Sequence, residues 1–321
     1  MSCVDRKQRV NAVLERTIGY QLSRPLADRA WRIPPPKLLN SVLVRVTGYQ
    51  LSRPLADRAW KLPSAQGGRL LTAPVFVFSA PRSGSTLLRV ILGSHTSLYA
   101  PPELPLKHLG VRAETAWIRA SLEGLELTAE DLEHMLWDRV LAEALLRSGK
   151  PRLVVKTPSN VLVWERIAAC WPDAKFVFLL RHPAAAVASL HSSFDPAWRP
   201  EEAGSMEESV ARGLRYMTAI EEARSALSGF TVRYEELTAS PERVVGELCG
   251  FLGVPFEPDM LDYGRFGHAG FTPGLGDSSL NIRSGRIQPP APMPDEIPAG
   301  LAEICALWGY PHPDNEPSGV G

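Results

Sequence analysis

The stretch at residues 74–93, PVFVFSAPRSGSTLLRVILG, constrains the fold of this chain more than any other segment. A run of β-branched and aromatic residues, Val75 to Phe78, passes through a Ser- and Gly-rich turn, Ser79 to Ser85, into an apolar segment that starts at Thr86. This order predicts a buried parallel strand, a tight turn and a helix. The free N–H groups and the positive dipole end of such a helix would face an anion held by the turn. The segment therefore predicts a phosphate-binding loop.

The turn differs from the loop of nucleotide triphosphatases. That loop, G-x-x-x-x-G-K-[ST], would need Gly where Ser79 stands and Lys where Ser85 stands. The missing Lys normally reaches the β- and γ-phosphates. One phosphate could still be held by backbone N–H groups, two hydroxyls and a guanidinium. These groups would come from Arg82, Ser83, Gly84, Ser85 and Thr86. A turn that merely joins a strand to a helix is the alternative.

The octapeptide PRSGSTLL resembles a loop of sulfotransferases. In that family the loop binds the 5′-phosphosulfate end of 3′-phosphoadenosine 5′-phosphosulfate (PAPS), and the form PRSG[ST]T is typical of bacterial and protein-tyrosine sulfotransferases. The resemblance implies an α/β fold in which a P-loop-like parallel sheet is flanked by helices, and it covers roughly residues 72–310. It also implies PAPS as the sulfonate donor and a reaction that needs no metal.

A second apolar segment, Lys175 to Leu180, predicts another strand, and the residues that follow it resemble a second part of the cofactor site. It ends in Arg181-His182-Pro183, and a helix of small residues is expected from Ala184 to Leu190. In the family, an arginine at the end of such a strand and a serine eight residues later grip the 3′-phosphate of the cofactor. Arg181 and Ser189 have that spacing. The carboxyl end of a strand presents its side chains to the crevice of the sheet. A plain surface charge at Arg181 is the alternative.

Composition limits the other classes of function. The chain has 321 residues and 45% hydrophobic residues, enough for one large α/β domain or two small ones. Lys plus Arg equals Asp plus Glu at 35 each, so no overall charge favours nucleic acid or an anionic membrane. Neither a signal peptide nor an apolar run of about 20 residues is present. The four cysteines are scattered, without metal-ligand spacing, and indicate core thiols in a reducing compartment. The sequence predicts a soluble, cytoplasmic protein without a membrane span.

A tandem duplication precedes residue 70. Gly19 to Trp31 recurs without change as Gly48 to Trp60, an offset of 29 residues. Two copies are too few for a stable solenoid. We therefore expect a helical N-terminal extension at residues 1–69 and a catalytic domain at residues 70–321. The copies could dock a partner or cover the substrate, or one copy could pack on the core while the other is tolerated on the surface.

Beyond residue 70 the pattern alternates strands and helices, which predicts a parallel sheet with helices on both faces. The expected strands include Leu153 to Val155 and Phe230 to Tyr234, and the expected helices are Thr128 to Leu146, Glu207 to Leu227 and Pro241 to Leu252.

Sulfonate transfer requires positively charged side chains next to the oxygens of the transferred group and next to the leaving oxygen. Lys156 follows a short strand in the sequence KTP. This element resembles the K-[TD]-P element of sulfotransferases, whose ammonium group contacts the transferred group and the leaving phosphate oxygen. Together with Arg82, Lys156 is the predicted electrophilic residue; a surface lysine is the alternative.

Glu103 is the predicted general base for the acceptor hydroxyl. It lies in the sequence APPEL, after the helix that follows the loop. This resembles the arrangement of tyrosyl-protein and several bacterial sulfotransferases, in which a glutamate takes the hydroxyl proton. Sulfotransferases that act on small molecules use a histidine instead, so His95, His108 and His268 remain alternatives.

Two later segments complete the predicted cofactor site. Tyr234, in VRYEEL, resembles the tyrosine of the family's late strand, which approaches the adenosine or its 3′-phosphate. Arg283, Ser284 and Gly285 resemble a late R-[KS]-G element that adds a grip on the 3′-phosphate. A core aromatic residue and an ordinary basic surface loop are the alternatives.

These observations predict a PAPS-dependent O-sulfotransferase. The acceptor is left open between a hydroxyacyl chain, which a carrier protein could present, another small alcohol, a glycan or lipid hydroxyl, and a peptide tyrosine, with the hydroxyacyl or small-molecule alcohol favoured. The alternatives are a P-loop kinase that uses ATP and a catalytically silent nucleotide-binding or docking module. The absent loop lysine argues against the kinase.

Overall fold

The computed structural model describes residues 21–23, 50–52, 69–192, 204–266, 280–290, 292–294 and 297–312. It divides the chain into two units, residues 1–67 and 68–321. In the first unit, strands β1 (Gln21–Ser23) and β2 (Gln50–Ser52) pair in antiparallel fashion, with Leu22 opposite Leu51. Both strands are the triplet QLS of the duplicated segment. These six residues are strand rather than helix, and the rest of the expected helical extension lies outside the described residues.

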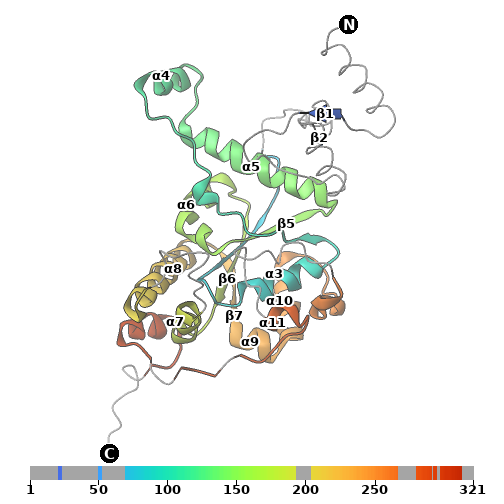
Figure 1. Ribbon diagram of the computed structural model, residues 1–321, viewed down its shortest axis with the longest axis vertical. Coiled ribbons are helices and arrows are strands. Elements are labelled where there is room, and N and C mark those ends of the chain that lie inside the picture. Colours follow the sequence, from blue (N-terminus) through green and yellow to red (C-terminus); the bar gives the residue numbers. More distant parts are fainter. Residues whose placement is uncertain are drawn as a thin grey trace, which may run out of the picture. The chain divides into compact units, whose positions relative to one another are not determined.

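A five-stranded, all-parallel sheet forms the centre of the second unit (Figure 1). Its order is β4-β5-β3-β6-β7. The strands are β3 (Val75–Ser79), β4 (Leu98–Tyr99), β5 (Arg152–Lys156), β6 (Lys175–Leu180) and β7 (Gly229–Arg233). Because β3 comes first in sequence and lies in the middle, the strand order reverses beside it. In open α/β sheets, ligands bind outside the carboxyl ends of the strands at such a point. The predicted α/β architecture is confirmed.

Helices follow the strands. They are α3 (Ser85–Ser94), α4 (Ala116–Gly124), α5 (Ala129–Ser148), α6 (Trp164–Cys170), α7 (Pro183–Ser192), α8 (Met206–Ala226), α9 (Tyr234–Ala239), α10 (Pro241–Leu252), α11 (Leu280–Arg283) and α12 (Ala302–Trp308). Short 3₁₀ turns are η2 (Leu106–His108), η3 (Pro158–Val163), η5 (Pro258–Leu261), η6 (Tyr263–Arg265) and η7 (Ala299–Leu301). The predicted long helices are present within two residues of their expected bounds. None of the described helices is both long and apolar enough to cross a membrane.

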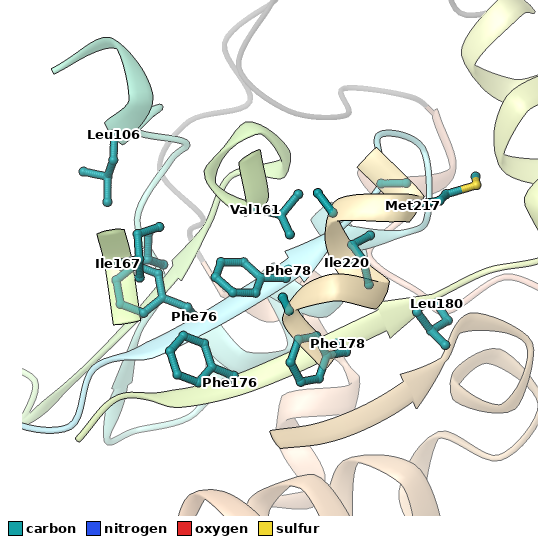
Figure 2. Close-up of a cluster of buried hydrophobic side chains, with 14 of the residues drawn as sticks. Phe76, Phe78, Leu106, Val161, Ile167, Phe176, Phe178, Leu180, Met217 and Ile220 are labelled. Atoms are coloured by element: carbon teal, nitrogen blue, oxygen red, sulfur yellow. The ribbon is translucent and has the colours of Figure 1, made fainter. Parts of the chain in front are cut away.

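Both faces of the sheet are buried, which explains the continuous apolar runs of its strands. One face presents the phenylalanines of β3 and β6, including Phe78 and Phe176 at 5.5 Å between ring centroids, to residues of α6 and α8 (Figure 2). Residues of α5 belong to the same core cluster. The other face presents Val75, Val77 and Val177 to α3 and α10. The core thus holds the central strands rigidly, and their carboxyl ends are fixed relative to one another.

The buried carboxylate of Asp138 on α5 anchors the chain that leads into β3. It accepts hydrogen bonds from the backbone N–H groups of Leu70 and Leu71, at 2.6 and 3.1 Å, and from the indole N–H of Trp171 at 3.0 Å. Three donors satisfy a charge that would otherwise be costly to bury. These bonds attach the segment before β3 to α5 and to Trp171.

The cysteines of the second unit are core residues. Cys170, Cys249 and Cys305 are buried free thiols. Burial raises the pKa of the Cys170 thiol to about 12 and those of Cys249 and Cys305 to about 11. Such thiols are poor nucleophiles because the reactive form is the thiolate.

Candidate active site

The predicted phosphate loop connects β3 to α3. Gly84 caps α3 with φ of 84°, and no side-chain hydrogen bond caps the helix. A helix start of this kind can bind an anion through its backbone N–H groups. A Cβ atom at Gly84 would stand 2.3 Å from the ring of Tyr234. Only glycine therefore fits between the helix start and that ring. The predicted loop and the predicted late tyrosine are in contact.

Two serine hydroxyls in the loop region are buried without a partner in the described part of the chain. Ser83 is 1% exposed and Ser79 is fully buried, and neither Oγ makes a hydrogen bond there. An unsatisfied buried hydroxyl costs about 1–3 kcal/mol. A ligand oxygen bound in the loop would remove this cost for Ser83, which is one of the predicted cofactor contacts.

Hydrogen bonds join the two predicted phosphate grips, which are the loop with Arg82 and the pair of Arg181 and Ser189. Nη1 of Arg181, directly after β6, donates to the backbone oxygen of Arg82 at 2.7 Å. Nε of Arg82 donates to Oγ of Ser189, on α7, at 3.3 Å. Arg82 has φ of 63°, a left-handed conformation that costs a non-glycine residue about 1–2 kcal/mol. The bonds to Arg181 and Ser189 hold it in that conformation.

Tyr234 is the first residue of α9 and not, as expected, the end of a strand. The guanidinium of Arg181 lies 4.7 Å from the centroid of its ring. Since Gly84 also contacts this ring, Tyr234 links the loop to the second grip. Burial lowers the pKa of Arg181, and Tyr234 and Glu235 act in the opposite direction. The guanidinium stays charged because arginine is not deprotonated in proteins.

Glu235 and the C-terminal segment stabilise the turn that carries Arg181. The N–H of His182 donates to Oε1 of Glu235 at 2.9 Å, and the hydroxyl of Tyr310 donates to Oε2 at 2.7 Å. Nε2 of His182 lies 3.0 Å from the carbonyl oxygen of Pro311. Burial lowers the pKa of His182. The C-terminal segment thereby fixes the backbone next to the proposed 3′-phosphate grip.

Glu103 and Lys156, predicted as base and electrophile, form an ion pair. Lys156 is the last residue of β5, and its side chain is 1% exposed, whereas the side chain of Glu103 is 20% exposed. The segment after Glu103 is fastened to the turn after β5: the N–H of Leu104 donates to Oγ1 of Thr157, and the N–H of Leu106 to Oδ1 of Asn160, both at 2.9 Å. Sequence reasoning missed the roles of Thr157 and Asn160, which follow Lys156 by one and four residues.

The alternative bases differ in their surroundings. His95 is fully buried at the far end of α3; its Nε2 lies 2.8 Å from the carbonyl oxygen of Pro255, and its Nδ1 accepts from the N–H of Ser97 at 2.9 Å. Both ring nitrogens therefore serve the local structure. His108 is exposed on η2, and His268 lies outside the described residues. Of the candidates, Glu103 is the one that the structure places against Lys156.

The late loop has its own local contacts. Gly285 has φ of 72°, and a Cβ there would stand 2.6 Å from Cα of Gly264. Arg283 and Ser284 are exposed, and Oγ of Ser284 accepts from the N–H of Arg286 at 3.3 Å. Their proposed contact with the 3′-phosphate stays a prediction.

Arg89 is a charged residue near the site that sequence reasoning missed. It lies on α3, is 2% exposed, and donates from Nη1 to the carbonyl oxygen of Ala100 at 3.3 Å. Burial lowers its pKa, and the charge of Glu103 acts in the opposite direction. A single arginine within the apolar run STLLRVIL was the available signal.

The arrangement suits transfer of a strongly anionic group. Lys156, Arg82 and Arg181 follow or end three neighbouring strands, β5, β3 and β6, at the same edge of the sheet. A carboxylate, Glu103, stands beside the lysine. No group of three or more His, Cys, Asp or Glu side chains that could hold a metal ion is found among the described residues. Fixed cations around a crevice stabilise charge that develops on an oxyanion.

A family comparison identifies the same region. The profile of the sulfotransferase family matches residues 74–258, from the start of the strand before the loop to the first residue of η5.

Known proteins and structures are similar to this part of the chain. An uncharacterized protein of Aquifex aeolicus is 31% identical over 59% of this chain and 26% of its own length, and a protein-tyrosine sulfotransferase of Drosophila melanogaster is 24% identical over 60% of this chain and 40% of its own. The chain thus spans less than half of these two relatives. The sulfotransferase domain from the curacin biosynthetic pathway is 25% identical, with a TM-score of 0.53, over 77% of this chain and 100% of that domain. The sulfotransferase domain of the Synechococcus PCC 7002 olefin synthase, also 25% identical, has a TM-score of 0.50 over 76% of this chain and 98% of that domain.

Proposed function

The chain belongs to the sulfotransferase family, and we propose that it transfers a sulfonate group from PAPS to an acceptor hydroxyl. The observation that carries this proposal is the contact between the two phosphate grips. Arg82 bonds to Ser189 and Arg181 bonds to Arg82, so the loop lies directly beside the residues of the second grip. PAPS carries a 5′-phosphosulfate and a 3′-phosphate on one ribose, and two adjacent binding elements suit these two groups.

The residues present fit this cofactor. Backbone N–H groups at the start of α3 and the unpartnered hydroxyl of Ser83 would hold the 5′-phosphate, together with Ser85 and Thr86. Arg181 and Ser189 would hold the 3′-phosphate, and Tyr234 would pack beside it. Because Gly84 has no side chain, the ring of Tyr234 packs directly against the backbone at the start of α3, beside the proposed phosphate site.

The chemistry follows from the ion pair. The acceptor oxygen forms a bond to sulfur while the bond from sulfur to the phosphate oxygen breaks, and the electron pair of that bond leaves with the phosphate. Glu103 takes the hydroxyl proton. Lys156 and Arg82 stabilise the charge that moves onto the departing oxygen. Because Lys156 is nearly fully buried, its charge acts with little screening by water.

The ion pair also sets the geometry of the site. It holds the carboxylate of Glu103 beside the ammonium group of Lys156, so the proposed base and the proposed electrophilic residue lie together before the substrates bind.

For the acceptor, we propose a hydroxyacyl chain or another small-molecule alcohol, which a carrier protein could present. Two similar solved structures, from the curacin pathway and from an olefin synthase, are named as biosynthetic sulfotransferase domains. The equal numbers of acidic and basic residues give no general attraction for acidic peptides or polysaccharides. A protein tyrosine is the second candidate, since a protein-tyrosine sulfotransferase is among the relatives.

Transfer of labelled sulfonate tests the proposal. The full chain is incubated with labelled PAPS and separate hydroxyacyl, phenol, glycan and tyrosyl-peptide acceptors, and mass spectrometry identifies a product that is heavier by one sulfonate. The expected result is PAPS-dependent labelling of one class, absent with ATP. Phosphate transfer from ATP would instead support the kinase, and binding of the nucleotide without transfer to any acceptor would support the silent module.

A further inference from the structure

His182 lies between the two residues of the second phosphate grip. It follows Arg181 directly, and α7, which carries Ser189, begins at the residue after it. Strand β6 ends at Leu180, which pairs with Arg233 of β7, so Arg181 and His182 form the connection between this strand and α7. The positions of Arg181 and Ser189 relative to the sheet therefore depend on the contacts that hold His182.

Three polar groups of His182 are bonded, and the residue is 4% exposed. Its backbone N–H donates to Oε1 of Glu235 at 2.9 Å. Its Nδ1 accepts from the N–H of Ala184, in the first turn of α7, at 3.3 Å. A ring nitrogen that accepts carries no proton, so the proton is on Nε2, which donates to the carbonyl oxygen of Pro311 at 3.0 Å. His182 thus attaches the start of α7 to α9 and to the C-terminal segment.

Tyr310 contacts both Glu235 and His182. Its hydroxyl donates to Oε2 of Glu235 at 2.7 Å, and its ring centroid lies 5.1 Å from that of His182. Burial raises the pKa of Tyr310, so the hydroxyl keeps its proton at neutral pH. The guanidinium of Arg233 lies 4.7 Å from the centroid of the tyrosine ring and donates to the carbonyl oxygen of Trp308. Residues 308–311 are therefore attached to the residues at the carboxyl ends of β6 and β7.

Displacement of the second grip would affect two nucleotides differently. AMP and 3′-phosphoadenosine 5′-phosphate (PAP) share the 5′-phosphate, which the loop would hold, and only PAP has the 3′-phosphate that Arg181 and Ser189 would hold. A hydrogen bond weakens steeply when its angle departs from the preferred range. A shift of His182 would move both grip residues, and it would lower the affinity for PAP more than the affinity for AMP.

We propose that Tyr310 and Glu235 are positioning residues that set the preference of the site for a nucleotide with a 3′-phosphate. This inference rests on the proposed function. Both residues act through His182: Glu235 holds its backbone N–H, and Tyr310 holds the side chain of Glu235. The C-terminal segment thereby takes part in nucleotide recognition through the turn that it holds.

Calorimetric titration of the full chain with PAP and with AMP tests the proposal. The ratio of the two affinities removes any loss that both nucleotides share through the loop. In Tyr310→Phe, which loses one hydroxyl and keeps the ring, the preference for PAP should fall by about 3- to 10-fold, the contribution of one hydrogen bond. In Glu235→Ala, which loses two bonds, it should fall by about 10- to 100-fold. If Glu235→Ala does not fold, Tyr310→Phe alone decides the test.

Two control variants separate position from charge and from general stability. Glu235→Gln keeps an oxygen for the N–H of His182, and its NH2 group can donate to the hydroxyl oxygen of Tyr310, so the preference should stay near that of wild type. Glu221→Ala removes the acceptor of the indole N–H of Trp308, a bond of 2.9 Å that attaches the same segment to α8. This variant should melt at a lower temperature and keep the preference. An equal fall of the preference in Glu221→Ala would overturn the inference, because the preference would then follow stability alone.

Hydrogen exchange of the His182 amide, measured without nucleotide, gives an independent readout. This amide should exchange about tenfold faster in Tyr310→Phe than in wild type, because its acceptor Glu235 is less restrained, whereas the amide of Phe178, inside β6, should not change. Wild-type exchange at His182 in Tyr310→Phe, or a wild-type preference for PAP in both Tyr310→Phe and Glu235→Ala, would overturn the inference. Equal affinity of wild type for PAP and AMP would count against the proposed cofactor site, whereas the exchange of His182 would still decide whether Tyr310 positions the turn.

Discussion

Nε of Arg82 donates a hydrogen bond to Oγ of Ser189, which lies 107 residues later in the chain. One residue belongs to the loop after β3 and the other to the helix after β6, and these strands are neighbours in the sheet. The bond therefore joins the parts of the site that would hold the two ends of one nucleotide. A shift of the loop should therefore also shift the residues after β6, because Arg181 bonds to the backbone of Arg82 as well.

Nucleotide preference tests the second grip. PAP should bind more tightly than AMP, because Arg181 and Ser189 would contact its additional 3′-phosphate. A charge-assisted hydrogen bond contributes about 1.5–3 kcal/mol, so Arg181→Ala should weaken PAP binding by about 10- to 150-fold. Isothermal titration calorimetry with both nucleotides measures the ratio. Arg286→Ala, at an exposed arginine, is the matched control and should preserve the preference. Equal affinity of wild type for PAP and AMP would remove the assignment of Arg181.

A methyl group at Gly84 tests the loop. In Gly84→Ala the new Cβ would collide with the ring of Tyr234, and the positive φ alone costs about 1–2 kcal/mol. We expect a lower free energy of unfolding and loss of PAP binding. Gly246→Ala, on α10, is the control: open space surrounds that position, and alanine should stabilise the helix by about 0.5–1 kcal/mol. Urea unfolding and calorimetry check both variants. Unchanged PAP binding in Gly84→Ala would mean that the backbone of the loop does not approach the phosphate.

The sequence was sufficient to predict the strands that position the site. β3 and β6 are apolar on both faces because helices cover both sides of the sheet, and such runs are recognisable without a structure. Glu103 and Lys156 were both predicted as site residues, but their ion pair was not, since 53 residues separate them. The structure shows the contact because the segment with Glu103 is fastened to Thr157 and Asn160.

Other features could not be read from local patterns. Tyr234 was expected at the end of a strand, yet β7 ends at Arg233 and a helix begins at the next residue. A boundary of this kind depends on what the side chain packs against, here Arg181 and Gly84. Arg89 was overlooked because an apolar helix usually signals only a core. Its partner, the carbonyl of Ala100, is a backbone group that no side-chain pattern reveals.

The buried carboxylate of Asp138 should matter for stability rather than for chemistry. Asp138→Ala would leave the N–H groups of Leu70, Leu71 and Trp171 without their acceptor, at about 1–3 kcal/mol for each buried donor. The bonds from Leu71 and Trp171 are buried and that from Leu70 is partly buried, so the free energy of unfolding should fall by at least about 2 kcal/mol. Asp173→Ala is the control: this exposed carboxylate accepts a single bond from the N–H of Ala73, and its loss should cost about 0.5–1.5 kcal/mol. Urea denaturation gives both values, and equal costs would contradict the proposed anchor.

Deletion of one duplicated copy, residues 11–39, should leave the catalytic unit folded and able to bind PAP. The remaining chain keeps one complete copy of GYQLSRPLADRAW, and the sheet with its phosphate loop belongs to the unit at residues 68–321. Calorimetric melting and PAP titration of the deletion variant are the measurements. Loss of the cooperative transition would show that the first copy is needed by the core. A preserved transition with a selective loss of turnover on a protein-borne acceptor would favour a docking role for the duplication.

The role of Glu103 can be separated from cofactor binding. Glu103→Gln keeps the shape of the side chain but removes its ability to accept a proton, and the loop, Arg181 and Ser189 are untouched. PAP affinity should therefore be near that of wild type, while turnover should fall by about 10²- to 10⁴-fold, the usual contribution of a positioned general base. Calorimetry and the sulfonate-transfer assay measure the two effects. His108→Ala, at an exposed histidine on η2, should retain turnover. If Glu103→Gln instead turns over at nearly the wild-type rate, the base is another residue; His95 already uses both ring nitrogens in local contacts, so His108 and His268 would then be the first to test.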